Sequence, residues 1–130
     1  VFVYSFDGRA PNKARRAREL IREALATHKG VISFQVAQEF FNVALRRFAH
    51  PMSASEAEQY LGTVFRPLMA IQSSPSLYTD ALQLTGRYRL SWYDSLIVAA
   101  AIRAECGLLY SEDLQHGQQF YELQIRNPFL

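Results

Sequence analysis

The chain has 130 residues, 49% of them hydrophobic and 20% charged, with a formal net charge of +2. This is enough for one folded domain with a sizeable core, and it excludes a disordered chain. No apolar run approaches the roughly 20 residues that cross a bilayer, no signal-peptide pattern opens the chain, and the single Cys106 excludes an internal disulfide framework or a multi-cysteine zinc site. We therefore expect a cytoplasmic protein that does not enter a membrane.

The first part of the chain predicts a helix, a strand and a second helix. Residues 13–27 place apolar side chains on one helical face and arginines on the other, and Gly30 is expected to end this helix. Residues 31–34 are a short apolar run typical of a strand, and a second helix is expected over about residues 35–48. The inward side chains of that helix are expected to be Val36, Phe40, Val43 and Ala44.

Two further helices follow. Ser53 and Ser55 each precede a glutamate by three positions, so a capping box opens a third helix that runs to about Leu68. A fourth helix follows Pro75. The side chains that should face inward from the fourth helix are Leu77, Ala81, Leu82 and Leu84.

The last part of the chain is the most apolar. Residues 91–105 are hydrophobic on all sides around residues 96–102, which indicates a helix buried on most of its surface. Short strands are expected at residues 108–110 and 123–126.

Helices that alternate with short, non-amphipathic strands indicate an α/β fold with a parallel sheet covered on both faces. We expect one domain over residues 1–130, a Rossmann-like three-layer sandwich. A doubly wound sheet normally starts with a central strand, and we expect that strand to precede Val1.

The acidic residues suggest a metal site. Glu39 lies on or beside the inward face of its helix, Asp94 starts the buried helix, and Glu112 and Asp113 directly follow the strand at residues 108–110. Open α/β sheets bind ligands at the carboxyl ends of their strands, and carboxylates that meet there repel each other unless a divalent cation joins them. Each acid also has a structural explanation: a capping box for Asp94, an exposed helix position for Glu39, and a turn for the last two.

Other site chemistries have less support. The three histidines (His28, His50 and His116) lack zinc-ligand spacing. No glycine-rich phosphate loop is present, and no serine occupies a nucleophile elbow.

Three segments, residues 31–39, 90–101 and 109–117, resemble the PIN-domain ribonucleases, most closely the VapC-like toxins of type II toxin–antitoxin systems. The resemblance implies a PIN-like fold and a Mg²⁺- or Mn²⁺-dependent endoribonuclease that hydrolyses RNA phosphodiester bonds. In that family four acids hold the metal. The second, third and fourth fall on Glu39, Asp94 and Asp113, with Ser111 as the family's Ser/Thr and Glu112 beside it.

The family's first acid has no counterpart here. In the family, a leading Asp-Thr/Ser-Asn motif is followed by a stretch like residues 1–7. We therefore expect the chain to begin directly after that motif. Without the first acid, the activity of residues 1–130 on their own is in question. Asp7 resembles a loop acid. Residues 1–6 alternate like a strand, whereas the resemblance implies a short helix.

The resemblance also implies partners. Residues 1–50 carry nine Lys/Arg against four acids, and residues 51–130 carry five against eight. A basic surface suits RNA. The residues that could hold its backbone are Arg9, Lys13, Arg15 and Arg16. An antitoxin and a second copy of the chain are further expected partners.

The apolar side chains Tyr60, Val64, Phe65 and Leu68 serve either a homodimer surface or the core. The alternative to the enzyme is a non-catalytic PIN-like module that binds RNA or protein with an incomplete metal site. A flavodoxin-like signalling domain would need a strand-end aspartate and a paired lysine, which we do not find.

Overall fold

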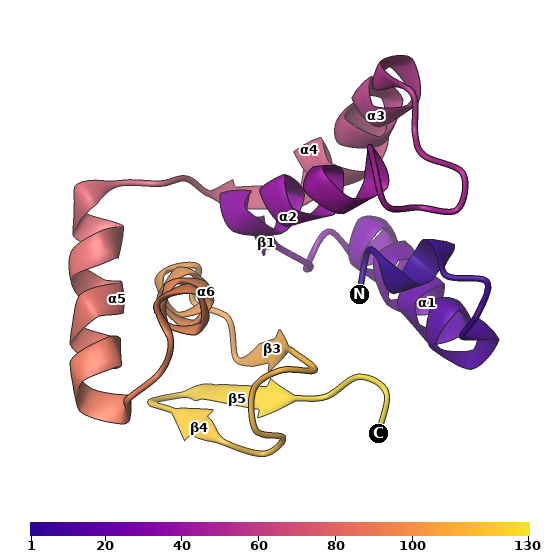
Figure 1. Ribbon diagram of the computed structural model, residues 1–130. Helices are drawn as coiled ribbons and strands as arrows, with labels where there is room; N and C mark the ends of the chain where they lie inside the picture. The colour runs from indigo at the N-terminus through magenta and orange to yellow at the C-terminus, as the bar shows by residue number, and fades with distance from the viewer. The chain divides into compact units, whose positions relative to one another are not determined.

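Helices alternate with short strands along the chain, which confirms the predicted α/β class (Figure 1). The computed structural model describes residues 1–130, and their contacts divide the chain into an N-terminal unit, residues 1–70, and a C-terminal unit, residues 71–130. None of the helices combines the length and the apolarity that a membrane span requires.

The first long helix, α1 (Pro11–Thr27), agrees with the prediction but starts two residues earlier. A proline at the first helical position loses nothing, because its missing N–H would have no partner there. The helix ends at His28, which adopts a left-handed conformation (φ 58°), and not at Gly30. Gly30 is needed for another reason, since a Cβ at this position would lie 2.3 Å from the Cβ of Ala24.

A short 3₁₀ helix, η1 (Tyr4–Phe6), precedes α1. The buried Ser5 donates its hydroxyl to the carbonyl of Phe2 at 2.6 Å, and Arg18 of α1 donates to the carbonyl of Ser5 at 3.1 Å. The strand suggested by the alternating residues is therefore wrong, and the short helix implied by the resemblance is confirmed. The hydrogen bonds within this turn and to α1 stabilise the 3₁₀ helix more than the alternating residues favour a strand.

Strand β1 (Ile32–Ser33) leads directly into α2 (Phe34–Ala44) and pairs with β2 (Met69–Ile71), a segment that the sequence pattern did not predict as a strand. The helix ends four residues earlier than expected, because residues 45–47 form a turn. Its buried side chains are Gln35, Ala37, Phe40 and Ala44. Val36 and Val43, expected to face inward, are only half-buried.

The next helical stretch consists of α3 (Ala54–Tyr60), one π turn, η2 (Leu61–Phe65), and α4 (Arg66–Leu68). The capping box forms at Ser53, whose hydroxyl accepts from the N–H of Glu56 at 3.1 Å while the Glu56 carboxylate accepts from the N–H of Ser53 at 3.0 Å. The helix therefore starts at Ser53 and not at Ser55. Pro67 has no N–H to donate back to the preceding turn, which accounts for the widened π turn.

Aromatic rings form the core of the N-terminal unit. Phe40 and Phe65 are almost completely buried, at 1% and 0% exposure. The ring of Phe40 stacks on Tyr60 at 4.8 Å between centroids and meets Phe65 edge-on at 5.2 Å. Burial raises the pKa of the Tyr60 hydroxyl. Since Leu68 is also buried, core packing accounts for most of the large apolar side chains of this stretch.

In the C-terminal unit, α5 (Pro75–Tyr88) packs against α6 (Trp92–Arg103). The buried side chains of α5 are Leu77, Ala81 and Leu84, whereas Leu82, expected to face inward, is 60% exposed. Leu82 lies about 100° around the helix from Ala81, which places it off the buried stripe. The hydroxyl of Thr85 donates to that of the fully buried Ser95 at 2.7 Å, so the polar groups in this interface are paired.

The sheet of this unit has the order β3-β5-β4. Strands β3 (Leu108–Tyr110) and β5 (Leu123–Arg126) match the predicted ranges and are parallel, with Leu109 opposite Ile125. Strand β4 (Gln119–Phe120), which was not predicted, pairs antiparallel with β5. Two residues are too few to show the alternation of apolar and polar side chains from which a strand is predicted.

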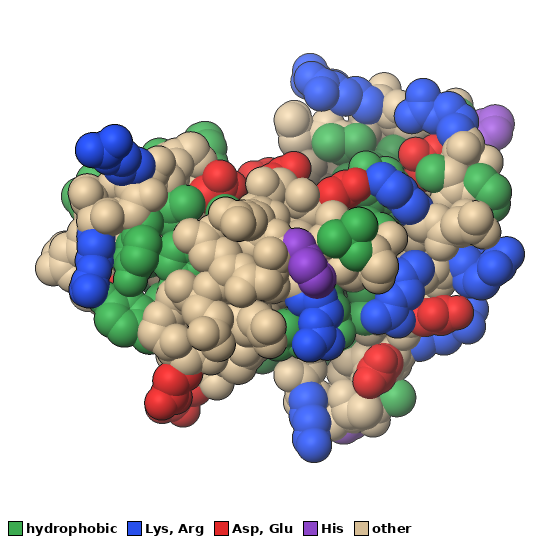
Figure 2. Space-filling model, turned by 90° about the horizontal axis from the view of Figure 1, so that it is seen from below, with side chains coloured by type: hydrophobic (Ala, Val, Ile, Leu, Met, Phe, Trp, Pro, Cys, Tyr) green, Lys and Arg blue, Asp and Glu red, His purple; other side chains and the backbone are tan.

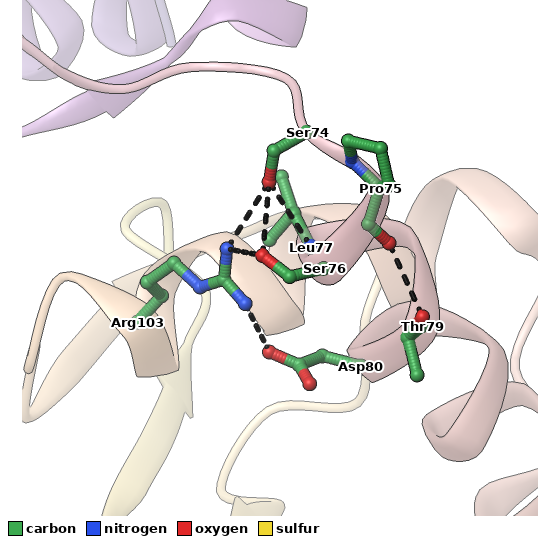
Figure 3. Close-up of polar contacts among 7 residues, drawn as sticks. All are labelled: Ser74, Pro75, Ser76, Leu77, Thr79, Asp80 and Arg103. Atoms are coloured by element: carbon green, nitrogen blue, oxygen red, sulfur yellow. Dashed lines mark hydrogen bonds and ion pairs between the residues drawn. The ribbon is translucent and has the colours of Figure 1, made fainter.

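One arginine joins the two helices of this unit (Figure 3). Arg103, at the end of α6, donates to the Asp80 carboxylate at 2.6 Å and to the hydroxyl of Ser76 at 2.9 Å. It also donates to the hydroxyl of Ser74 at 3.2 Å, and Ser74 caps α5 by accepting from the N–H of Leu77. The contact ties the start of α5 to the end of α6.

We expect Phe40→Ala to lower the free energy of unfolding by about 3–5 kcal/mol, because it removes a buried ring at the centre of the aromatic core. Leu45→Ala, an exposed position just after α2, should change it by less than about 0.5 kcal/mol. Urea denaturation measures both. A loss below about 1 kcal/mol for Phe40→Ala would contradict this core.

The capping box predicts a pH dependence. The backbone hydrogen bond from Ser53 lowers the pKa of Glu56, so this pair stabilises the fold above the usual pKa of glutamate and its contribution is lost as the pH falls through the lowered value. The stability difference between wild type and Glu56→Gln should therefore shrink in acid, because only the glutamate loses its charge there. Glu58→Gln, an exposed glutamate of the same helix, is the matched control and should show no such trend. Thermal unfolding at several pH values measures it.

Candidate metal centre

Glu39 lies in the second turn of α2 and is exposed. One of its carboxylate oxygens, Oε1, accepts a hydrogen bond from the side-chain amide of Gln35 at 3.0 Å. Its partner is therefore a neutral amide and not a lysine or an arginine.

Asp94 lies in the first turn of α6 and is half-buried. The hydroxyl of Ser91 accepts from the N–H of Asp94 at 3.2 Å, which is one half of the capping box that the sequence allowed. The other half, in which the carboxylate would accept from the N–H of Ser91, is not formed. The carboxylate of Asp94 makes no hydrogen bond or ion pair. Capping of the helix therefore accounts for the serine at position 91, but it does not account for the aspartate at position 94.

Ser111 shapes the turn that carries Glu112 and Asp113. Its N–H donates to the carbonyl of Arg126 at 3.0 Å and extends the parallel ladder by one bond. Its hydroxyl accepts from the N–H of Leu114 at 3.2 Å, and the buried Leu114 anchors the far side of the turn. The two acids are therefore exposed at the carboxyl end of β3, and Asp113 makes no hydrogen bond or ion pair.

The three predicted metal ligands are divided between the units. Glu39 belongs to the N-terminal unit, whereas Asp94 and Asp113 belong to the C-terminal unit. No group of three or more His, Cys, Asp or Glu side chains is assembled for a metal ion. Convergence of the three carboxylates on one cation stays a prediction.

The donor chemistry of these residues fits a hard divalent cation. All three side chains offer carboxylate oxygens, the ligands that Mg²⁺ and Mn²⁺ prefer, and none is paired with a lysine or arginine. A zinc-type site is disfavoured, because burial raises the pKa of the Cys106 thiol and the three histidines are exposed.

The candidate RNA-backbone residues belong to α1 and the loop before it. Lys and Arg side chains gather over the N-terminal unit (Figure 2). Arg9 pairs with Asp7 at 3.3 Å, and its backbone N–H lowers the pKa of that carboxyl. Arg16 lies 3.8 Å from the carboxylate of Glu19. Arg15 is exposed without an ion pair, and Lys13 lies 4.7 Å from the centre of the Tyr4 ring.

A cavity of about 490 Å³ lies between α5, α6 and the turn that joins β4 to β5. That turn precedes β5, so the cavity is at the opposite end of the sheet from Ser111. The arginine that lines it, Arg87, already donates to the hydroxyl of Tyr121 at 3.0 Å. The cavity is therefore separate from the turn that carries Glu112 and Asp113.

Sequence reasoning did not single out Gln35, the residue that contacts Glu39. The signal was present, because a glutamine four residues before a glutamate lies on the same face of a helix.

The family model of the PIN domain matches residues 1–119, a range that includes Glu39, Asp94 and Asp113. No curated protein matches the sequence. PIN domains are a nuclease-type fold family, and they typically use divalent metal ions. With these carboxylates and this α/β order of elements, the chain belongs to the PIN domain family.

Proposed function

We propose that this protein is a Mg²⁺- or Mn²⁺-dependent endoribonuclease in which Glu39, Asp94 and Asp113 hold the cation. The observation that carries the proposal is the carboxylate of Asp94, which makes no hydrogen bond or ion pair although Ser91 caps the same helix. A carboxylate without a partner in the protein is free to bind a hard divalent cation. Membership of a nuclease-type family supports the same function.

Each residue has a defined task in this proposal. Ser111 shapes the turn that presents Asp113, Ser91 fixes the first turn of α6 that presents Asp94, and Gln35 contacts Glu39. Glu112 adds negative charge beside Asp113. Glu39, Asp94 and Asp113 would hold a divalent cation, which would supply activation of water and neutralisation of charge on the phosphate.

The basic residues would hold the RNA. Arg9, Lys13, Arg15 and Arg16 present positive charge from α1 and the loop before it. Contacts of this kind attract the phosphate backbone and carry little sequence information.

The resemblance to VapC-like toxins supports a more specific role. We propose a cytoplasmic toxin that a cognate antitoxin protein silences. The homodimer proposal rests on the same resemblance, since Phe65 and Leu68 are buried in the core of the N-terminal unit and are not free to form a surface.

The alternative function is a PIN-like module that binds RNA or protein without cleaving it. One observation favours it, namely that Glu39 and Asp113 are exposed, as surface acids without a ligand role also are. The two functions differ in RNA cleavage. An endoribonuclease cleaves RNA and loses this activity when one carboxylate is removed, whereas a binding module binds RNA without cleaving it.

Asp94→Asn in the full-length protein should abolish Mg²⁺-dependent RNA cleavage. Changes in residues that merely orient metal ligands already cost 10–100-fold, so loss of a ligand should exceed about 100-fold. Stability should hold or rise, because the Asp94 carboxylate takes no part in the cap and the carboxylates repel each other less. Cleavage of a labelled RNA and thermal unfolding measure the two effects.

The matched control is Ser74→Ala, which removes the cap of α5 in the same unit and leaves Asp94 and its turn unchanged. It should lower stability by about 1 kcal/mol and retain cleavage. A folded Asp94→Asn protein with undiminished cleavage would end the catalytic assignment. No cleavage by the wild type, with RNA binding retained, would favour the binding module.

Arg15→Ala should weaken RNA binding equally for different sequences and reduce the slope of log K against log salt by about 1, since one phosphate contact is lost. Arg89→Ala, an exposed arginine of the C-terminal unit, is the control and should leave the slope unchanged. Fluorescence anisotropy at several salt concentrations measures the slope. An unchanged slope for Arg15→Ala would remove Arg15 from the proposed RNA interface.

A further inference from the structure

We propose that Gln35 is a positioning residue that holds the carboxylate of Glu39 in one orientation for cation binding. The proposal rests on the proposed function and adds a residue to its metal centre. Gln35 is the second residue of α2, and Glu39 follows it by one helical turn. The amide Nε2 of Gln35 lies 3.0 Å from Oε1 of Glu39.

The burial of the two side chains differs sharply. Gln35 is only 7% exposed, whereas Glu39 is exposed. The contact therefore runs from the inside of the unit to its surface. It uses one carboxylate oxygen, and Oε2 of Glu39 makes no hydrogen bond. This second oxygen remains available to a ligand.

The orientation of the Gln35 amide follows from its partner. An ionised carboxylate can only accept hydrogen bonds, so the amide must turn its NH₂ group towards Glu39. Its carbonyl oxygen Oε1 then points elsewhere, and there it is buried without a hydrogen-bond partner. The unpaired oxygen is a direct consequence of the contact with Glu39.

A buried acceptor without a partner destabilises the folded state, and folded proteins contain few of them. A methionine at position 35 would fill a similar volume and bury no unpaired polar atom. Stability therefore does not explain the glutamine. Ser33, the residue that precedes α2, is 4% exposed and its hydroxyl is also unpaired, so two polar side chains at this helix start share the same feature.

The hydrogen bond from Gln35 restricts the conformational freedom of the Glu39 side chain. A free glutamate side chain samples several rotamers and loses this freedom when it binds a cation. The amide of Gln35 restricts the carboxylate beforehand, as hydrogen-bonded neighbours do for metal ligands in general, and loss of such neighbours typically lowers metal affinity 10–100-fold.

The test is Gln35→Met in the full-length protein, with Mn²⁺ alone as the probe. Electron paramagnetic resonance of free Mn²⁺ gives the dissociation constant, which we expect to rise about 10–100-fold. Thermal unfolding without metal should give an unchanged or higher Tm, because the unpaired oxygen is removed. The matched control is Gln38→Met, an exposed glutamine of the same helix, which should change neither quantity.

A double-mutant cycle shows whether Gln35 acts through Glu39. Glu39→Gln should weaken Mn²⁺ binding, and adding Gln35→Met to it should have no further effect. A further loss in the double variant, or a lowered Tm with an unchanged Mn²⁺ constant for Gln35→Met, would overturn the positioning role while the proposed function stands. If neither Glu39→Gln nor Asp94→Asn weakens Mn²⁺ binding, the metal centre itself fails, and the positioning role with it.

Discussion

The packing of Phe40 determines how α2 is rotated, and the candidate metal centre depends on that rotation. Phe40 is enclosed by Tyr60, Phe65 and other rings of the N-terminal unit, so the helix cannot turn about its axis without exposing it. Glu39 precedes Phe40 and lies about 100° around the helix. The same rotation buries Gln35 and leaves Glu39 at the surface, so an aromatic core on one side of the helix presents a carboxylate on another.

Serine hydroxyls play a common part at the other two acids. At the start of α6, Ser91 accepts from the N–H of Asp94, and after β3, Ser111 accepts from the N–H of Leu114. Backbone N–H groups near a helix start or in a turn need acceptors, and a nearby carboxylate would otherwise supply one. Because serine takes this role in both places, Asp94 and Asp113 keep their carboxylates free. Asp80 shows the contrast, since Arg103 pairs with it at 2.6 Å and it serves to join two helices.

The local pattern and the packed structure disagree most where long-range contacts decide the outcome. Residues 1–6 alternate like a strand, yet contacts with α1 hold residues 4–6 as a 3₁₀ helix. The helix predicted from Ser53 to Leu68 is interrupted because Pro67 cannot donate to the preceding turn. Val36 was expected inside, but the large ring of Phe40 sets the buried stripe so that Ala37 lies inside in its place.

The sequence by itself determined the α/β class, a buried helix within residues 91–105 and both strands at 108–110 and 123–126, because each of these depends on local spacing and on the polarity of neighbouring residues. It also singled out the acids that we propose as cation ligands. Only the tertiary structure decided which partner each polar side chain takes. It shows that Ser91 caps α6 without help from the Asp94 carboxylate, and that Gln35 is buried against Glu39 with its carbonyl oxygen unpaired. The physical reason is that a hydrogen bond requires a fixed distance and direction, and these are set by how a helix is rotated in the core and not by the residues that flank the group in the chain.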